Sequence, residues 1–87
     1  MVKKQRWHVY VLYSPATGRL YTGISPDPHK RLVKHNAGKG AKYTRAGRPW
    51  QIVWTRLCDS KSEALKMEYL IKKMKRQEKL LFTGLAA

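Results

Sequence analysis

Hydrophobic and polar positions change their spacing along the chain, and this change predicts the order of the elements. The run 7–13 is rich in β-branched and aromatic residues, which is typical of a buried strand, and 19–24 is a second extended run. The segment 14–18 between them has turn chemistry, so the two runs predict a β-hairpin with a loop of about four or five residues. The run 50–58 predicts a third strand.

Helices are predicted from their caps and from apolar residues at helical spacing. Asp27 and Pro28 favour a helix start, because Asp accepts hydrogen bonds from free N–H groups and Pro suits the first helical position. This helix should end near Gly38. Ser60, with Glu63 three residues later, predicts the start of a second helix. Its expected apolar stripe is Ala64, Met67, Leu70, Ile71 and Met74.

The remaining segments complete one domain. A basic turn or short helix is expected over 76–85, and 39–49 is expected to be a loop. The order β-β-α-β-α(α) predicts an α/β fold of the α+β kind, with a small three-stranded, mainly antiparallel sheet flanked by helices. The expected domain spans 7–82, between a basic N-terminal tail at 1–6 and a C-terminal tail at 83–87.

Charge changes this picture most. Nineteen Lys and Arg stand against five Asp and Glu, a formal net charge of +14 on 87 residues. Such a field attracts polyanions, with nucleic acid as the commonest partner and an anionic membrane as the second; a merely soluble or ribosome-associated basic protein is the plainer alternative. The loop 39–49 holds no acidic residue and is expected to follow a phosphate backbone. The nucleic-acid-binding candidates are Lys34, Lys39, Lys42, Tyr43, Arg45 and Arg48.

Cysteine usage and the chain start exclude several classes of protein. Cys58 is the one cysteine, so no internal disulfide can form, which fits a reducing compartment. It lies in an apolar run and is expected in the core rather than as a nucleophile. No long apolar segment follows the basic start, so we expect no signal peptide, no membrane span and a cytoplasmic protein.

Five polar residues have positions that favour chemistry. Tyr10 lies in the middle of the first strand and Tyr21 near the end of the second, so the hairpin can bring both phenols to one face. Arg31 and His35 are four residues apart and share one face of the first helix. Glu68 lies at the border of the apolar stripe of the second helix.

Each of these residues, taken alone, also has an ordinary explanation. The tyrosines would be a core residue and an edge-strand aromatic, and the two residues of the first helix would be a solvated face or a favourable charge at the helix end. Glu68 precedes Lys72 by four residues, which is an ordinary helix ion pair worth ~0.2–0.5 kcal/mol. These separate explanations do not account for the occurrence of all five residues together in this order and spacing.

Together these residues resemble the GIY-YIG superfamily of nucleases. The similarity covers about 7–81 and is closest to small single-domain bacterial members, which share the loop style of 38–45. The first motif lacks the usual Gly-Ile before its tyrosine, and no Asn follows Asn36, where many members carry one near the domain end. The residues that match the family, in order, are His8-Val9-Tyr10, Tyr21-Thr22-Gly23, Arg31, His35 and Glu68.

The resemblance implies an endonuclease that hydrolyses DNA phosphodiester bonds with one Mg²⁺ or Mn²⁺ ion. In that reaction Glu68 binds the metal and Arg31 clamps phosphate oxygens. Tyr21 acts as general base or positions the water, with Tyr10 beside it, and His35 orients water or a tyrosine. A free phenol has a pKa of about 10, so a nearby cation must lower it for a base at neutral pH.

The sequence carries no recognisable DNA-specificity domain, so we expect non-sequence-specific or structure-selective action, in DNA repair or recombination. A homodimer or a partner protein is the other expected source of specificity. The alternative hypothesis is a non-catalytic DNA- or RNA-binding module on the same fold. A third is a basic structural protein of a ribonucleoprotein. DNA is favoured over RNA by the resemblance alone.

Overall fold

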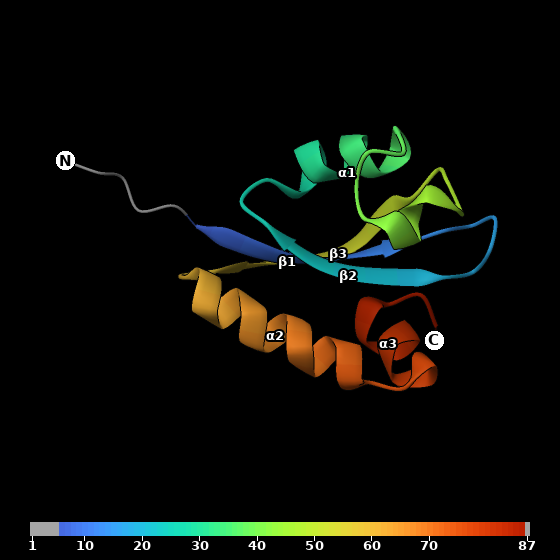
Figure 1. Ribbon diagram of the computed structural model, residues 1–87. Coiled ribbons are helices and arrows are strands. Elements are labelled where there is room, and N and C mark those ends of the chain that lie inside the picture. Colours follow the sequence, from blue (N-terminus) through green and yellow to red (C-terminus); the bar gives the residue numbers. More distant parts are fainter. Residues whose placement is uncertain (1–5, 87) are drawn as a thin grey trace.

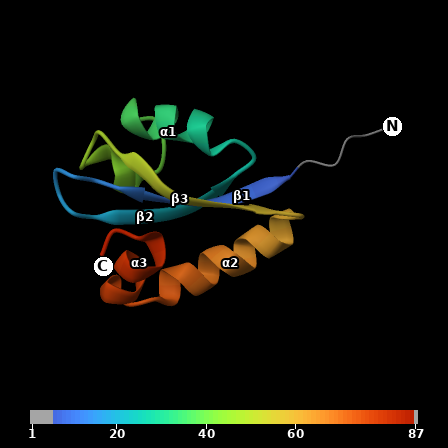
Figure 2. The same ribbon diagram turned by 180° about the vertical axis from the view of Figure 1, so that it is seen from behind.

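A three-stranded antiparallel sheet separates the helices into two layers in the computed structural model, which describes residues 6–86 (Figure 1). Helix α1 covers one face, and α2 and α3 lie on the other, as the reverse view confirms (Figure 2). The elements are β1 Trp7–Tyr13, β2 Leu20–Ser25, α1 Pro28–Asn36, the 3₁₀ helix η1 Lys42–Arg45, β3 Gln51–Cys58, α2 Lys61–Lys73 and α3 Arg76–Thr83. The predicted fold class is therefore confirmed.

Strand β1 lies in the centre of the sheet, between β2 and β3. It pairs with β2 from His8 opposite Ser25 to Tyr13 opposite Leu20, and a register shift interrupts its pairing with β3 after Val11. Because side chains alternate along a strand, β1 supplies both faces of the sheet and is the most buried strand.

Two apolar clusters fill the two faces. Val9 and Val11 point to the α2 layer, where they meet Cys58, Ala64 and Ile71. On the opposite face the buried residues are Tyr10, Leu12 and Trp50. This two-residue alternation puts the first predicted tyrosine in the α1 layer, away from α2.

Both predicted helix starts are confirmed by their caps. The Asp27 carboxylate accepts a hydrogen bond from the backbone N–H of Lys30, and the Ser60 hydroxyl accepts one from that of Glu63. Helix α1 ends two residues before Gly38, whose backbone φ is 77°. Such a positive φ favours glycine, so this residue turns the chain out of the helix.

Two expectations need correction. Leu70 is 58% exposed, although it was expected in the apolar stripe of α2. The stripe that contacts the sheet is narrower and centres on Ala64, Met67, Ile71 and Met74, with Leu70 on one border and Glu68 on the other. The segment 39–49 is a loop interrupted by η1, because the carbonyl of Ala41 binds the backbone N–H of Thr44 at 3.0 Å.

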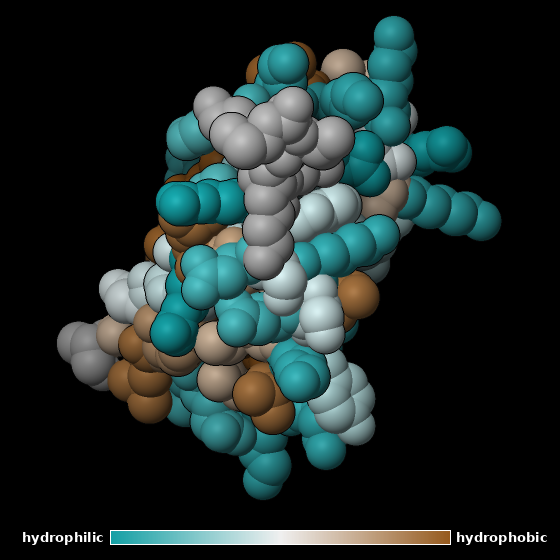
Figure 3. All heavy atoms as spheres, turned by 90° about the vertical axis from the view of Figure 1, so that its left-hand side faces the viewer, coloured by the Kyte–Doolittle hydropathy of each residue, from teal (hydrophilic) through white to brown (hydrophobic). Residues whose placement is uncertain are grey.

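One face of the molecule shows how polar and apolar side chains are distributed on the surface. On the face seen in Figure 3, hydrophilic side chains project over most of the surface and hydrophobic residues emerge in small groups. Within residues 6–86, no helix has both the length and the apolar character that crossing a membrane requires. The predicted N-terminal tail lies outside the described residues except for Arg6, and so does Ala87 at the other end.

Candidate active site

The hairpin register brings the two tyrosines together. Tyr10 lies opposite Gly23, and Tyr21 lies opposite Leu12, so both side chains point to the α1 face and meet diagonally. Their ring centroids are 6.3 Å apart. A Cβ atom on Gly23 would lie 2.6 Å from the Tyr10 hydroxyl oxygen, so only glycine fits at this position.

Helix α1 adds a histidine to this pair. His35 is 0% exposed, and its ring lies 5.1 Å from that of Tyr21 between centroids. The Nε2 atom of His35 is 3.0 Å from the Tyr10 hydroxyl, and Nδ1 is 2.7 Å from the Thr44 hydroxyl. The interpretation of His35 as part of a solvated helix face is therefore wrong.

The hydrogen-bond pattern assigns the tautomer of His35. The Thr44 hydroxyl donates to the carbonyl of Ala41 at 2.8 Å, so it can only accept from His35. His35 is then protonated on Nδ1, and its Nε2 accepts the hydrogen of Tyr10. The result is a chain of donors that runs from Tyr10 through His35 and Thr44 to Ala41, with every polar atom satisfied.

Burial keeps both members of the pair neutral. It lowers the pKa of His35 to about 4, with the nearby Arg31 charge acting in the same direction. It also raises the pKa of Tyr10 to about 12, helped by Tyr21 and Glu68 and opposed by Arg31. Tyr10 is 1% exposed, whereas Tyr21 is half-buried. Tyr21 is therefore the phenol of the pair that a ligand can reach.

Polar contacts that the sequence did not predict fix the loop that covers this site. The indole Nε1 of Trp50 donates to the carbonyl of Thr44 at 2.9 Å, and Asn36 makes two hydrogen bonds to the backbone of Trp50. The Ser14 hydroxyl donates to the carbonyl of Gly47 at 2.6 Å and joins the hairpin turn to the loop. Gly40 packs directly against the His35 ring, where a Cβ would collide.

Aromatic rings continue from the site to the surface. Tyr43 on η1 stacks on Tyr21 with centroids 6.1 Å apart and an angle of 24° between the rings. On its other side it is tilted against the buried Trp50. Tyr43 is 47% exposed, so the row of rings extends from the buried pair to solvent.

Basic side chains surround the site on the α1 side. Arg31 is half-buried and lines a depression of about 320 Å³ with Lys30 and Lys34, next to the β2–α1 turn. All six predicted nucleic-acid-binding residues are exposed. Arg48 lies farther away, at the end of α1, where it donates to the carbonyl of Arg45.

Glu68 is placed differently from the other four predicted site residues. It comes from α2, on the opposite face of the sheet, and its side chain is 18% exposed (Figure 1). Its carboxylate pairs with Lys72 at 3.3 Å, the ion pair that the four-residue spacing also predicts. Its charge nevertheless reaches the tyrosine site, since it contributes to the raised pKa of Tyr10.

The donors available for a metal ion are few. Residues 6–86 contain no group of three or more His, Cys, Asp or Glu side chains that could together hold an ion. A single partly open carboxylate fits a hard divalent cation that keeps several waters and completes its shell with substrate phosphate oxygens. The donors present therefore suit a hydrated Mg²⁺ or Mn²⁺ ion at Glu68, and they do not suit an ion that needs several protein ligands.

A paired-tyrosine hairpin, an Arg and a His on the next helix, and a Glu on a later helix define a class of phosphodiester-cleaving domain. The family model described as the GIY-YIG catalytic domain matches residues 6–81, and the chain belongs to this nuclease family. The identification predicted from the motifs is thus confirmed. The roles of the individual residues stay predictions.

Relatives and solved structures agree with this identification. The chain is 51% identical over 73 residues to a UPF0213 protein of Staphylococcus saprophyticus, a match that covers 84% of this chain and 89% of the relative. It is similar in structure to the UPF0213 protein BH0048 from Bacillus halodurans (TM-score 0.58, 40% identity, 92% and 84% of the two chains). It is also similar to the protein EF2693 from E. faecalis (TM-score 0.60, 34% identity, 98% and 91% of the two chains).

Proposed function

We propose that this protein is a divalent-metal-dependent endonuclease that hydrolyses DNA phosphodiester bonds, without sequence specificity or with selectivity for DNA structure. The observation that carries the proposal is the convergence of Tyr10, Tyr21, Arg31 and His35, in which the Tyr21 phenol is left accessible and Arg31 lines an open depression with Lys30 and Lys34. This is the set of groups that positioning a water and stabilising a charged phosphorane-like state require.

The chain's own residues divide the work by burial. Tyr21 takes the role of general base or positions the attacking water, because it alone of the pair is open to a ligand. Tyr10 and His35 hold the Tyr21 ring from behind and are positioning residues. Arg31 offers a planar pair of donors to phosphate oxygens, with Lys34 beside it in the same depression.

Glu68 is the residue that would hold the metal ion, which supplies charge neutralisation to the phosphate and the leaving oxygen when bound. To do so, its carboxylate must give up part of its ion pair with Lys72. Ion pairs between residues four apart on a helix typically contribute about 0.3–0.5 kcal/mol, so giving up this one costs little.

The proposed lack of sequence specificity follows from the chemistry of the exposed residues. Apart from Tyr43, the nucleic-acid-binding candidates are Lys and Arg side chains spread over α1 and the following loop, which suit backbone phosphates. Phosphate contacts position a protein on nucleic acid but carry no sequence information directly. One site per chain cuts one strand at a time, so two-strand cleavage would require a second copy or a partner.

A cleavage assay on duplex, nicked, flapped, branched and single-stranded DNA with Mg²⁺ or Mn²⁺ tests the proposal. Glu68→Gln and Arg31→Gln should lose cleavage and keep most binding. Asp59→Asn is the matched control, since Asp59 is an exposed acid near the start of the same helix. Equal cleavage by wild type and Glu68→Gln would sink the assigned site.

A second candidate, a binding module without catalysis, is favoured by one observation: Glu68 is already paired with Lys72. It predicts salt-dependent binding that is unaffected by metal, by EDTA or by Glu68→Gln, and no cleavage of any substrate. Adding RNA substrates to the same panel shows whether the protein prefers RNA or DNA. Preference for RNA without cleavage would favour the ribonucleoprotein hypothesis.

A further inference from the structure

A second basic depression lies at the other end of the aromatic row. Its volume is about 210 Å³, and the described residues that line it are Arg19, Leu20, Tyr43, Arg76 and Lys79. Three of these five side chains are cations and none is acidic. They come from the hairpin, from η1 and from α3, so the fold assembles the cluster from three distant segments of sequence.

We propose that Arg19, Arg76 and Lys79 form a phosphate-binding subsite that holds the nucleic-acid strand next to the tyrosine site. The inference rests in part on the proposed function, because the strand held at this subsite is the substrate that the tyrosine site is proposed to cut. It assigns a role to α3, which the motif residues leave without one.

Geometry connects this depression with the tyrosine site. Tyr43 lines the depression and stacks on Tyr21 at 6.1 Å, so the two sites share one aromatic wall. The Arg19 guanidinium carbon lies 5.8 Å from the centroid of the Tyr43 ring. One strand of DNA carries a phosphate roughly every 3.4 Å along the helix axis, so a strand cut at the tyrosine site has further phosphates, a few nucleotides away, that can lie in the depression.

The second arginine of the depression also lies against a neighbouring element. An added Cβ on Gly18 would lie 3.5 Å from a terminal nitrogen of Arg76, so its guanidinium lies against the hairpin turn. The acidic residue of α3, Glu78, accepts a hydrogen bond from the backbone N–H of Lys75 and serves as the helix cap. Guanidinium groups suit the geometry of phosphate, and Lys79 adds a point charge.

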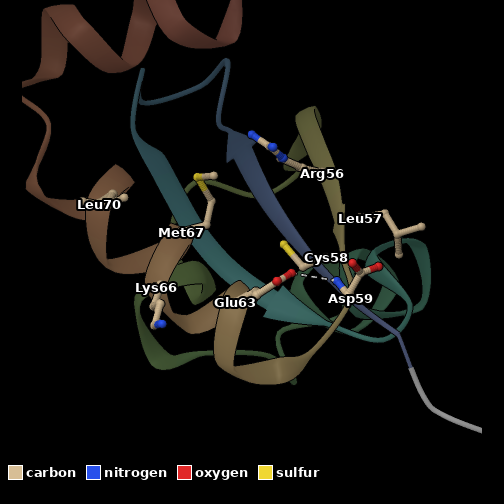
Figure 4. A pocket seen from close by; sticks show the side chains of 8 residues that line it. All are labelled: Arg56, Leu57, Cys58, Asp59, Glu63, Lys66, Met67 and Leu70. Carbon is tan, nitrogen blue, oxygen red and sulfur yellow. Dashed lines mark hydrogen bonds between the residues drawn. The ribbon is translucent and has the colours of Figure 1, made fainter.

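A depression between the end of β3 and the start of α2 provides a contrast. It is lined by Arg56, Leu57, Cys58, Asp59, Glu63, Lys66, Met67 and Leu70 (Figure 4). Here two carboxylates stand beside two cations, and Glu63 accepts a hydrogen bond from the backbone N–H of Asp59. Such mixed charge does not suit a phosphate. Replacing Arg56 and Lys66 in this depression therefore provides a control that changes the net charge by the same amount.

The test is a binding titration on the full chain, with EDTA present so that no strand is cut. A labelled single strand and a labelled duplex are titrated with wild type, with Arg76→Gln/Lys79→Gln and with the control Arg56→Gln/Lys66→Gln, at several salt concentrations. Circular dichroism melts establish that each variant is folded. Arg19→Gln is a second, single variant at the same subsite.

The subsite predicts that Arg76→Gln/Lys79→Gln weakens binding about tenfold or more, and well beyond the control. Each lost phosphate contact should also reduce the salt slope, by about 0.7 on a single strand and 0.9 on a duplex. Equal affinity and slope in the two double variants would overturn the inference. So would wild type binding inorganic phosphate as tightly as an oligonucleotide, because the depression would then be a free-phosphate site.

Cleavage, measured separately with Mg²⁺, keeps this inference apart from the proposed function. Arg76→Gln/Lys79→Gln should have a higher KM than wild type and a kcat within about twofold of it, since the tyrosine site is intact. If wild type binds through the subsite but never cuts, the nuclease proposal fails and the subsite stands. If wild type cuts and the double variant matches the control, the subsite alone fails.

Discussion

Removing the Tyr10 hydroxyl is the sharpest perturbation of the candidate site. Tyr10→Phe deletes the donor to His35 Nε2, a 3.0 Å bond in the interior, and leaves the ring in place. A buried acceptor without its partner costs about 1–3 kcal/mol. For a domain of this size, each kcal/mol lowers Tm by roughly 4–8 °C.

Tyr10→Phe should also slow cleavage, because Tyr10 is proposed to position Tyr21 and not to touch the substrate itself. Without the hydroxyl, His35 and the Tyr21 ring beside it are held less firmly, so we expect kcat to fall roughly 10–100-fold. KM should change little, because the exposed cations of α1 and the following loop are untouched. Urea unfolding gives the stability, and single-turnover cleavage gives the rate.

A double-mutant cycle tests whether the hydrogen-bond chain acts as a unit. Thr44→Val breaks the other end of the chain, at His35 Nδ1. Because both substitutions act on one histidine, the double variant with Tyr10→Phe should lose less stability than the sum of the single losses. Additive losses, or an unchanged kcat in Tyr10→Phe, would refute the positioning role.

Three further predictions concern packing, pH and metal. Gly23→Ala places a methyl group 2.6 Å from the Tyr10 hydroxyl oxygen. It should destabilise the fold by about 1–3 kcal/mol in urea unfolding and reduce cleavage; normal stability would contradict the packing. The pKa of His35 is lowered to about 4 in the folded state, so the unfolded chain binds the proton first as pH falls. The free energy of unfolding should therefore fall between about pH 6.5 and 4, by up to about 3 kcal/mol. The control His29→Gln, at an exposed site on the same helix, should show the same loss. A free energy of unfolding that stays constant over this range would contradict the buried, neutral His35. Lys72→Gln frees the Glu68 carboxylate, which is proposed to bind the metal, and should lower the Mg²⁺ concentration for half-maximal cleavage. A higher Mg²⁺ requirement would show that Lys72 assists the reaction instead of competing with the metal.

The order and type of the elements follow from the sequence because each has a local cause. The caps at Asp27 and Ser60 are formed by side chains three residues from their partners, so a short pattern reveals them. The strands follow from their apolar and β-branched composition. The diagonal meeting of Tyr10 and Tyr21 then follows from hairpin register alone.

What the sequence did not predict depends on contacts between distant residues. Ser14 and Thr44 are fully buried polar residues whose partners lie 33 and 9 positions away, and no spacing rule identifies such pairs. The sequence also left the two tyrosines nearly equivalent. Their division into a buried phenol and an accessible one is set by His35, which packs against both rings.

The separation of Glu68 from the tyrosines has a consequence for the unfolded chain. The +14 charge belongs to the sequence and persists when the fold is lost, so unfolded molecules retain attraction for nucleic acid. The proposed catalytic site does not persist, because its residues come from a hairpin, α1 and a helix on the far side of the sheet. A ligand that also binds the unfolded state stabilises a protein less than its affinity implies. Nucleic acid should therefore raise Tm only modestly, and on the proposed function, damaged molecules would bind substrate without cutting it.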